Sequence, residues 1–224
     1  MAKGKLINEA VGKLKHIINR NNAREAHKLA KELNLCKLDL NKKRIISLLE
    51  QVVCNDPDLE YVMGFAKVSG ADLKVLEQTV IRSNNAPLAY EFAQDIENAD
   101  VKALGETVAR IGDPESCYDF ADKVKGADKK ALERALIKSG DAGYALLFAR
   151  EIRGANIKAL QEIVINSGDP DICLNFARDV RGANIKALQE IVLKSPEHCV
   201  GFAKLKGANK KALEEVIINS KNNR

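Results

Sequence analysis

The sequence GANIKALQEIV occupies residues 154–164 and returns unchanged at residues 182–192. Four variants of it begin at Gly70, Asn98, Gly126 and Gly207. Successive copies start 28, 28, 28, 28 and 25 residues apart, and a fixed period between roughly 20 and 50 residues is the signature of a repeat protein. A second shared sequence lies between the copies and is clearest as GDPDICLNFARDVR at residues 168–181. Each repeat therefore contains two short segments and two turns.

The first segment of each repeat has the periodicity of a helix. Its apolar residues recur at i, i+4, i+5, i+8 and i+9, which places them on one helix face. In residues 154–164 they are Ala155, Ala159, Leu160, Ile163 and Val164. Asn156, or Asp72 in an earlier copy, can cap the free N–H groups of the first turn.

The second segment also predicts a helix. It opens with Asp113-Pro114 or Asp169-Pro170, where Asp is the N-cap and Pro takes the first helical position, which needs no N–H donor. The preceding residues Gly112, Gly140 and Gly168 suit the left-handed turn that closes the previous helix. The expected buried face consists of Ile172, Phe176, Ala177 and Val180.

The repeats continue toward the N-terminus in degenerate form, with Leu29 in the place of Phe92. The sequence therefore predicts an all-α protein, an α-solenoid or superhelix of about seven 28-residue helical-hairpin repeats plus a terminal helix. We expect one elongated domain over residues 1–224. Residues 1–69 would form degenerate N-terminal capping repeats, residues 70–206 the regular repeats, and residues 207–224 a C-terminal capping helix and tail.

The composition suits stacked helices. Only 4% of the residues are aromatic and Trp is absent, so Leu, Ile, Val and Ala must supply the apolar surface. The sequence shows no secretory signal and no stretch long enough to span a membrane. We expect a soluble, cytoplasmic protein with no membrane partner.

Three of the five cysteines occupy one position of the repeat. Cys117, Cys173 and Cys199 precede the repeated Phe by three residues, where other repeats have Val62, Ala89 and Ala145. A position that accepts Val, Ala or Cys is a small buried site. The cysteines form neither a disulfide framework nor a CxxC metal pattern, and we expect a structural role for them.

The sequence offers no constellation for catalysis. His16, His27 and His198 share no metal-ligand spacing, and no P-loop, GxGxxG, GxSxG or HExxH motif occurs. The many carboxylates fall on helix faces that we expect to be solvated. We therefore expect no enzymatic activity, catalytic residue, metal, cofactor or small-molecule substrate.

One polar position is Lys in all six clear copies: Lys74, Lys102, Lys130, Lys158, Lys186 and Lys211. It lies in the first turn of the predicted helix, where the helix dipole disfavours a cation. An ion pair with Glu four residues on could compensate in four copies, as between Lys158 and Glu162, and recent duplication could also preserve the Lys. Alternatively, the lysines form a row of cations on one edge that binds an anionic partner.

A second set of cations follows the repeated Phe by two residues: Lys67, Arg150, Arg178 and Lys204. Further cations end the same helices: Lys125, Arg153, Arg181 and Lys206. Cations at helix C-termini complement the dipole, so a structural role is sufficient to explain them. The tight Gly-Ala turn nevertheless places them beside the first-turn lysines, and we expect one basic edge.

Charge is distributed unevenly along the chain. The net charge is +8 over residues 1–44, −10 over residues 45–122 and +7 over residues 123–224. A solenoid that followed a phosphate backbone throughout would not have an acidic block at its centre, whereas complementary patches on a protein fit this pattern. The candidate binding residues are Lys102, Lys130, Lys158, Lys186, Lys211, Arg150, Arg178, Lys204, Glu91, Asp119 and Asp122.

These repeats resemble the tandem helix-turn-helix arrays of the α-solenoid group, which includes HEAT, tetratricopeptide and pentatricopeptide proteins. The resemblance covers nearly the whole chain and is architectural, because the unit is shorter than in those families and their signature residues are missing. It implies a recognition surface, usually concave, without chemistry of its own. We expect a non-enzymatic recognition scaffold that binds a protein in an adaptor, inhibitor or immunity-type role.

The alternative function is nucleic-acid binding through the Lys and Arg residues on one edge. Stacking on single-stranded bases needs aromatic side chains, and only Tyr90, Tyr118 and Tyr144 are candidates. A duplex or a structured RNA is therefore the form that this alternative takes.

Overall fold

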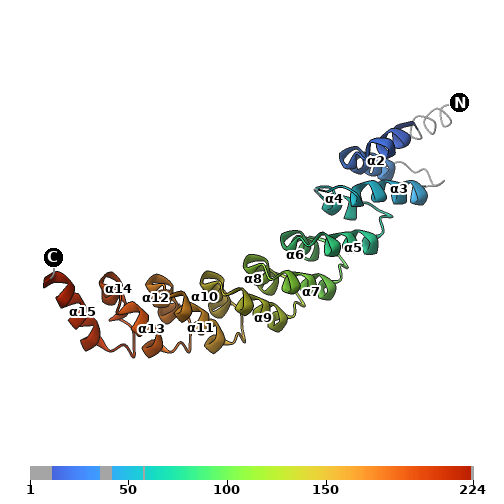
Figure 1. The fold of residues 1–224 in the computed structure, drawn as a ribbon. Helices are drawn as coiled ribbons and strands as arrows, with labels where there is room; N and C mark the ends of the chain where they lie inside the picture. Colours follow the sequence, from blue (N-terminus) through green and yellow to red (C-terminus); the bar gives the residue numbers. More distant parts are fainter. Residues whose placement is uncertain (1–11, 36–41, 58, 223–224) are drawn as a thin grey trace. The chain divides into compact units, whose positions relative to one another are not determined.

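The computed structural model describes residues 12–35, 42–57 and 59–222 (Figure 1). Every regular element in these ranges is an α-helix, which confirms the predicted all-α class. Residues 12–20 are helical. The following helices are α2 (Ala23–Leu35), α3 (Lys42–Cys54), α4 (Val62–Ala66), α5 (Leu73–Ser83), α6 (Ala86–Asp95), α7 (Val101–Ile111), α8 (Pro114–Lys123), α9 (Lys129–Ser139), α10 (Ala142–Glu151), α11 (Ile157–Ser167), α12 (Pro170–Asp179), α13 (Ile185–Val192), α14 (Pro196–Phe202) and α15 (Lys210–Asn222). The predicted capping repeats and tail fall partly on residues 1–11, 36–41, 58 and 223–224, outside the described ranges.

The chain divides into two compact units, Met1–Leu104 and Gly105–Arg224. In the first unit, α2 packs against α3 and α4, α3 against α4 and α5, and α5 against α6. Phe65 of α4 and Phe92 of α6 are fully buried. Sequence neighbours in this unit are thus also neighbours in space.

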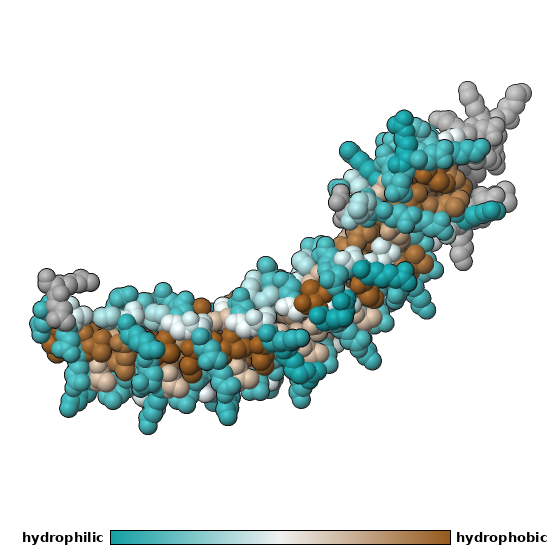
Figure 2. All heavy atoms as spheres, in the orientation of Figure 1, coloured by the Kyte–Doolittle hydropathy of each residue, from teal (hydrophilic) through white to brown (hydrophobic). Residues whose placement is uncertain are grey.

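In the second unit, each second helix packs against the first helix that follows it, in the pairs α8–α9, α10–α11, α12–α13 and α14–α15. The second helices α8, α10, α12 and α14 also contact one another in that order, and α9, α11 and α13 do the same (Figure 1). The repeated Phe lies between these rows: Phe120, Phe148, Phe176 and Phe202 are each at most 1% exposed. In Figure 2 hydrophobic surface runs between two hydrophilic edges of this unit.

The predicted helix starts are confirmed. The Asp113 and Asp169 side chains accept hydrogen bonds from the N–H groups of Ser116 and Ile172, with Pro at the start of each helix. The glycine before the second of these caps, Gly168, has φ +67°, a conformation that favours Gly. Caps and proline therefore set where α8 and α12 begin.

The cysteine position is also as predicted. Cys117, Cys173 and Cys199 are fully buried, and each thiol donates a hydrogen bond to a carbonyl of the preceding first helix. Burial raises the pKa of the Cys117 thiol to about 12 and that of Cys173 to about 11. These thiols are therefore protonated at neutral pH and unreactive.

Candidate functional site

Within the described ranges, six turns connect a second helix to the next first helix, and we call them junctions. They are residues 69–74, 97–102, 125–130, 153–158, 181–186 and 206–211. Each junction turns at a residue with positive φ, as at Gly154 (φ +86°). Each also contains the N-cap of the following helix, whose side chain accepts an N–H from the first turn. The caps are Asp72, Asp100, Asp128, Asn156, Asn184 and Asn209.

A buried side chain supports five of the six junctions. Glu50, Glu77, Glu133, Gln161 and Gln189 each accept the backbone N–H of the cap residue of the next junction, at 2.5 to 2.7 Å. None is more than 9% exposed. We call this set the acceptor ladder. The sequence analysis missed it, although a polar residue directly after the buried Leu of each apolar face was the available signal.

The acceptor ladder has one gap, at Gly105 of α7. A Cβ at this position would lie 3.2 Å from Cε1 of Phe120, so the Phe ring packs against the glycine. No described side chain accepts the backbone N–H of Asp128 in the junction that follows. The acceptor is therefore helpful rather than obligatory for this turn.

Carboxylates disappear from the junctions along the chain. Counting the cap and its buried acceptor, the first two junctions have two carboxylates each, the next two have one each, and the last two have none. Asn caps a helix about as well as Asp, and the Gln amide oxygen accepts the same hydrogen bond as Glu. The fold is therefore maintained while negative charge is removed.

The turns themselves show the same trend. The last four junctions read KGADKK, RGANIK, RGANIK and KGANKK, with ten Lys or Arg, one Asp and a net charge of +9. We call them the basic junctions. The first two read SGADLK and ENADVK and have a net charge of −1. The expected basic edge is thus present in the second unit, and Lys102, a candidate from the sequence, lies outside it in an acidic turn.

The cations of the basic junctions are exposed. They are Lys125, Lys129, Lys130, Arg153, Lys158, Arg181, Lys186, Lys206, Lys210 and Lys211. No salt bridge joins any of them to a residue in the described ranges, so the expected pairs such as Lys158–Glu162 do not form there. In Figure 2 hydrophilic side chains project from the edge where Figure 1 places these turns. These cations are therefore exposed charges without a salt bridge to another described residue.

The cations on the second helices are different. Arg150 Nε bonds to Glu151 at 2.7 Å, and Arg178 Nε bonds to Asp179 at 2.8 Å. The Arg178 hydrogen bond lowers the pKa of the Asp179 carboxyl. Lys204 is exposed. The arginines expected from the sequence to bind a partner therefore already have neighbouring carboxylates.

The acidic candidates lie on second helices. Glu91 is exposed on α6 in the first unit. In the second unit, Asp119 of α8 pairs with Lys123 at 2.8 Å, and Asp122 is exposed. The Tyr118 and Tyr144 rings lie 6.1 Å apart on this face, and burial followed by nearby carboxylates raises the pKa of both phenols. These acids are not part of the basic junctions.

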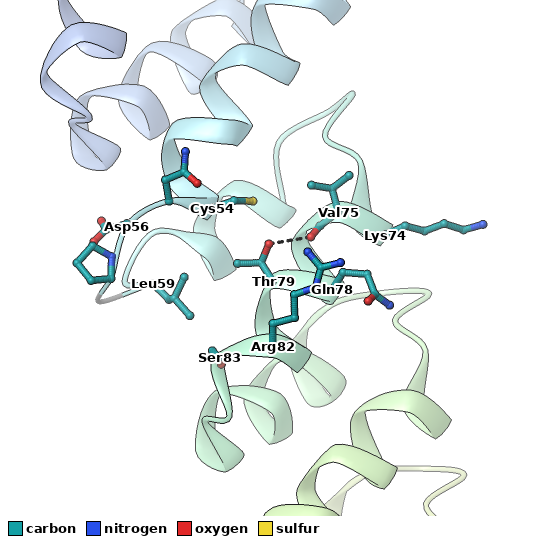
Figure 3. A pocket seen from close by; sticks show the side chains of 11 residues that line it. Cys54, Asp56, Leu59, Lys74, Val75, Gln78, Thr79, Arg82 and Ser83 are labelled. Atoms are coloured by element: carbon teal, nitrogen blue, oxygen red, sulfur yellow. Dashed lines mark hydrogen bonds between the residues drawn. The ribbon is translucent and has the colours of Figure 1, made fainter.

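A pocket of about 650 Å³ lies between α3 and α5 in the first unit (Figure 3). Its lining includes Cys54, Lys74 and Arg82, and Thr79 Oγ1 donates to the Val75 carbonyl at 2.9 Å. Lys74 points away from the other lining side chains in Figure 3. Burial raises the pKa of the Cys54 thiol, which does not favour a nucleophile. The pocket is open and its lining assembles no acid–base pair.

His198 forms hydrogen bonds with two neighbouring side chains. His198 lies 2.8 Å from Asp171 and 2.7 Å from the Ser195 hydroxyl. Among the described residues, no cluster of His, Cys, Asp or Glu has the arrangement of a metal site. None of the helices in the described ranges combines the length and apolar character needed to cross a bilayer.

Searches for related proteins add no family. No family model, curated protein or solved structure matches this chain.

Proposed function

We propose that this chain is a non-enzymatic recognition scaffold, built as an α-solenoid, whose basic junctions bind an anionic macromolecule. The observation that supports this most is the combination of +9 net charge in four turns with the lack of a salt bridge to any described residue. A charge that no neighbour neutralises is available to a partner.

The position of the lysines is itself costly for the fold. Lys158 and Lys186 lie in the first turns of α11 and α13, where a cation opposes the helix dipole by about 0.3–1 kcal/mol. The Glu residues four positions on do not pair with them, so this cost is not offset locally. Binding to an anion would offset it.

The sequence favoured a protein partner that contacts Arg150, Arg178 and the acidic residues Asp119 and Asp122. The intramolecular pairing of both arginines weakens that site, because a partner would have to displace Glu151 and Asp179. If the partner is a protein, we therefore propose that an acidic surface of that protein binds the basic junctions.

The test compares two variants with equal net charge. One replaces Arg153, Lys158, Arg181 and Lys186 by Gln, and the other replaces Lys138, Arg150, Arg178 and Lys194, which are exposed outside the junctions. On immobilised heparin, used as a generic polyanion, the first variant should elute at clearly lower salt than the second. Circular dichroism melting checks that both fold. Equal elution of the two variants would show that only net charge matters and would overturn the proposal.

A further inference from the structure

We infer that the partner of the basic junctions is the phosphate backbone of a nucleic-acid duplex, bound without regard to base sequence. This inference rests on the proposed function and names its partner. It concerns the second unit alone.

The basic junctions are uniform in a way that a protein partner does not require. Residues 153–158 and 181–186 are identical. Residues 125–130 and 206–211 keep a cation at both ends and the Gly-Ala turn, with Lys in place of Arg and of Ile, and Asp128 replaces the Asn cap in the first of them. A protein surface presents different groups at each position, whereas a phosphate backbone repeats one charge at a fixed interval. Uniform cations therefore match a repeating polyanion.

The uniformity of the junctions contrasts with the second helices. The second helices that precede the two identical junctions, α10 and α12, share only four of ten residues, AGYALLFARE against PDICLNFARD. The second helices have diverged, whereas the junctions and the first helices that follow them are identical as far as Val164 and Val192. The sequence that stays constant therefore includes the junctions and excludes the second helices.

The expected spacing suits a duplex. Packed helices lie about 8–10 Å apart, so four junctions in a row extend over about 24–30 Å. One strand of a duplex has a phosphate every 3.4 Å along the axis, and this length corresponds to about seven to nine base pairs. A row of helices held by the Phe core keeps its cations at a regular interval, as a stiff duplex keeps its phosphates.

The chemistry of the junctions favours duplex over single-stranded nucleic acid. Residues 125–130, 153–158, 181–186 and 206–211 contain no aromatic side chain, and single strands are bound largely by stacking on aromatic rings. The amides that could read base edges, as at Asn156 and Asn184, are engaged as N-caps. Contacts limited to phosphates carry no sequence information.

The acidic block, residues 45–122, does not argue against an anionic partner that binds only the second unit. Of its 15 acidic residues, ten fall at or before Leu104, in the first unit. Those in the second unit include Asp113, Glu115 and Asp119, which lie on or before α8 and outside the basic junctions. In the second unit, these acidic residues therefore lie away from the basic junctions.

The test measures fluorescence anisotropy of a labelled 20-base-pair DNA duplex of arbitrary sequence with the full chain. If each junction contacts about one phosphate, log Kobs should fall with log[salt] with a slope near −3.6, or about 100-fold between 50 and 200 mM salt. Replacing Lys158 and Lys186 by Gln should reduce the slope by about 2. The matched variant with Arg150→Gln and Arg178→Gln should keep the parent slope.

Competition separates this inference from the proposed function. Unlabelled duplexes of different sequence should displace the label equally, and poly-L-glutamate at the same charge concentration should not. Displacement by polyglutamate would retain an anionic partner and overturn the nucleic-acid assignment. Tighter binding of a 20-nucleotide single strand than of the duplex would overturn the duplex. No binding to any of these at 50 mM salt would overturn both proposals.

Discussion

The first two junctions and the last two are built alike and charged oppositely. In both pairs a side chain caps the first helix and a buried side chain of the preceding repeat accepts the cap residue's N–H. Residues 69–74 and 97–102 achieve this with Asp and Glu, whereas residues 181–186 and 206–211 use Asn and Gln. The turn needs an acceptor oxygen, which either a carboxylate or an amide can supply, so the charge of the turn can differ between the two units.

The largest effect should come from the buried Phe that recurs in each unit. Phe176→Ala should lower the free energy of unfolding by about 3–5 kcal/mol, because it leaves a cavity between stacked helices, and Phe65→Ala should have a similar effect in the first unit. Val200, which is 51% exposed, provides the control, since Val200→Ala should stay within about 0.5 kcal/mol. Chemical denaturation measures all three. A small loss at either Phe would mean that the repeated Phe does not contribute equally to the cores of the two units.

Removing a ladder acceptor should cost less than opening the core. Gln161→Leu keeps the volume but leaves the Asn184 N–H without its acceptor, a loss of about 1–3 kcal/mol. The neighbouring Glu162 is exposed, so Glu162→Leu is the matched control and should change stability little. Amide hydrogen exchange at Asn184 should accelerate in the first variant only. Equal hydrogen-exchange rates at Asn184 in the two variants would show that the acceptor ladder does not stabilise the turn.

Exchanging acid and amide in the acceptor ladder should have opposite effects in the two units. Burial raises the pKa of the Glu50 carboxyl above its usual value of 4.5. The folded state therefore binds more protons than the unfolded state above this pH, and stability falls as the pH rises from there. Glu50→Gln should therefore stabilise the protein at pH 7 by on the order of 1 kcal/mol and by less at pH 4. Gln189→Glu should destabilise it at pH 7. Thermal melting of both variants at pH 7 and pH 4 measures these effects. Changes of the same sign in the two melting temperatures at pH 7 would contradict the expected opposite effects of the two substitutions.

His27, also in the first unit, should make stability depend on pH in the opposite direction to Glu50. Its buried Nδ1 has no hydrogen-bond partner among the described residues, and a Cβ on Gly64 would lie 2.6 Å from the ring. Burial, and secondarily Lys31, lowers the His27 pKa. Stability is therefore complete above the unfolded-state pKa of 6.5 and declines as pH falls below it. In a Glu50→Gln background, His27→Phe should remove this decline, and an unchanged pH profile would exclude His27 as its source.

The smallest effect on stability should come from the caps. Asn184→Asp should change the free energy of unfolding by only a few tenths of a kcal/mol, because both residues cap well. The same change adds a carboxylate to a basic junction and should weaken polyanion binding several-fold, while Asp128→Asn should strengthen it. A large stability change in either variant would show that the cap charge matters to the fold.

The helices were predictable from the sequence because their signals are local. Asp169-Pro170 specifies a helix start within two residues, and the spacing of Phe176 and Val180 specifies a buried face. The acceptor ladder was not predicted, because its hydrogen bonds join residues far apart in the sequence. Gln161, for example, accepts the N–H of Asn184, 23 residues further on, and no local pattern identifies that partner. The pairing of Arg178 with Asp179 was also missed, because adjacent residues on a helix do not normally face each other.

The acceptor ladder also makes the length of the protein adjustable. Because Glu133 bonds the cap at residue 156 and Gln161 bonds the cap at residue 184, deletion of residues 156–183 would bring Asn184 to the position that Glu133 already serves. Because residues 154–164 and 182–192 are identical, the sequence around the join would be unchanged after this deletion. Unequal recombination between such segments could therefore add or delete whole repeats without a new fold having to evolve. Each event would change the footprint on a duplex by about three base pairs.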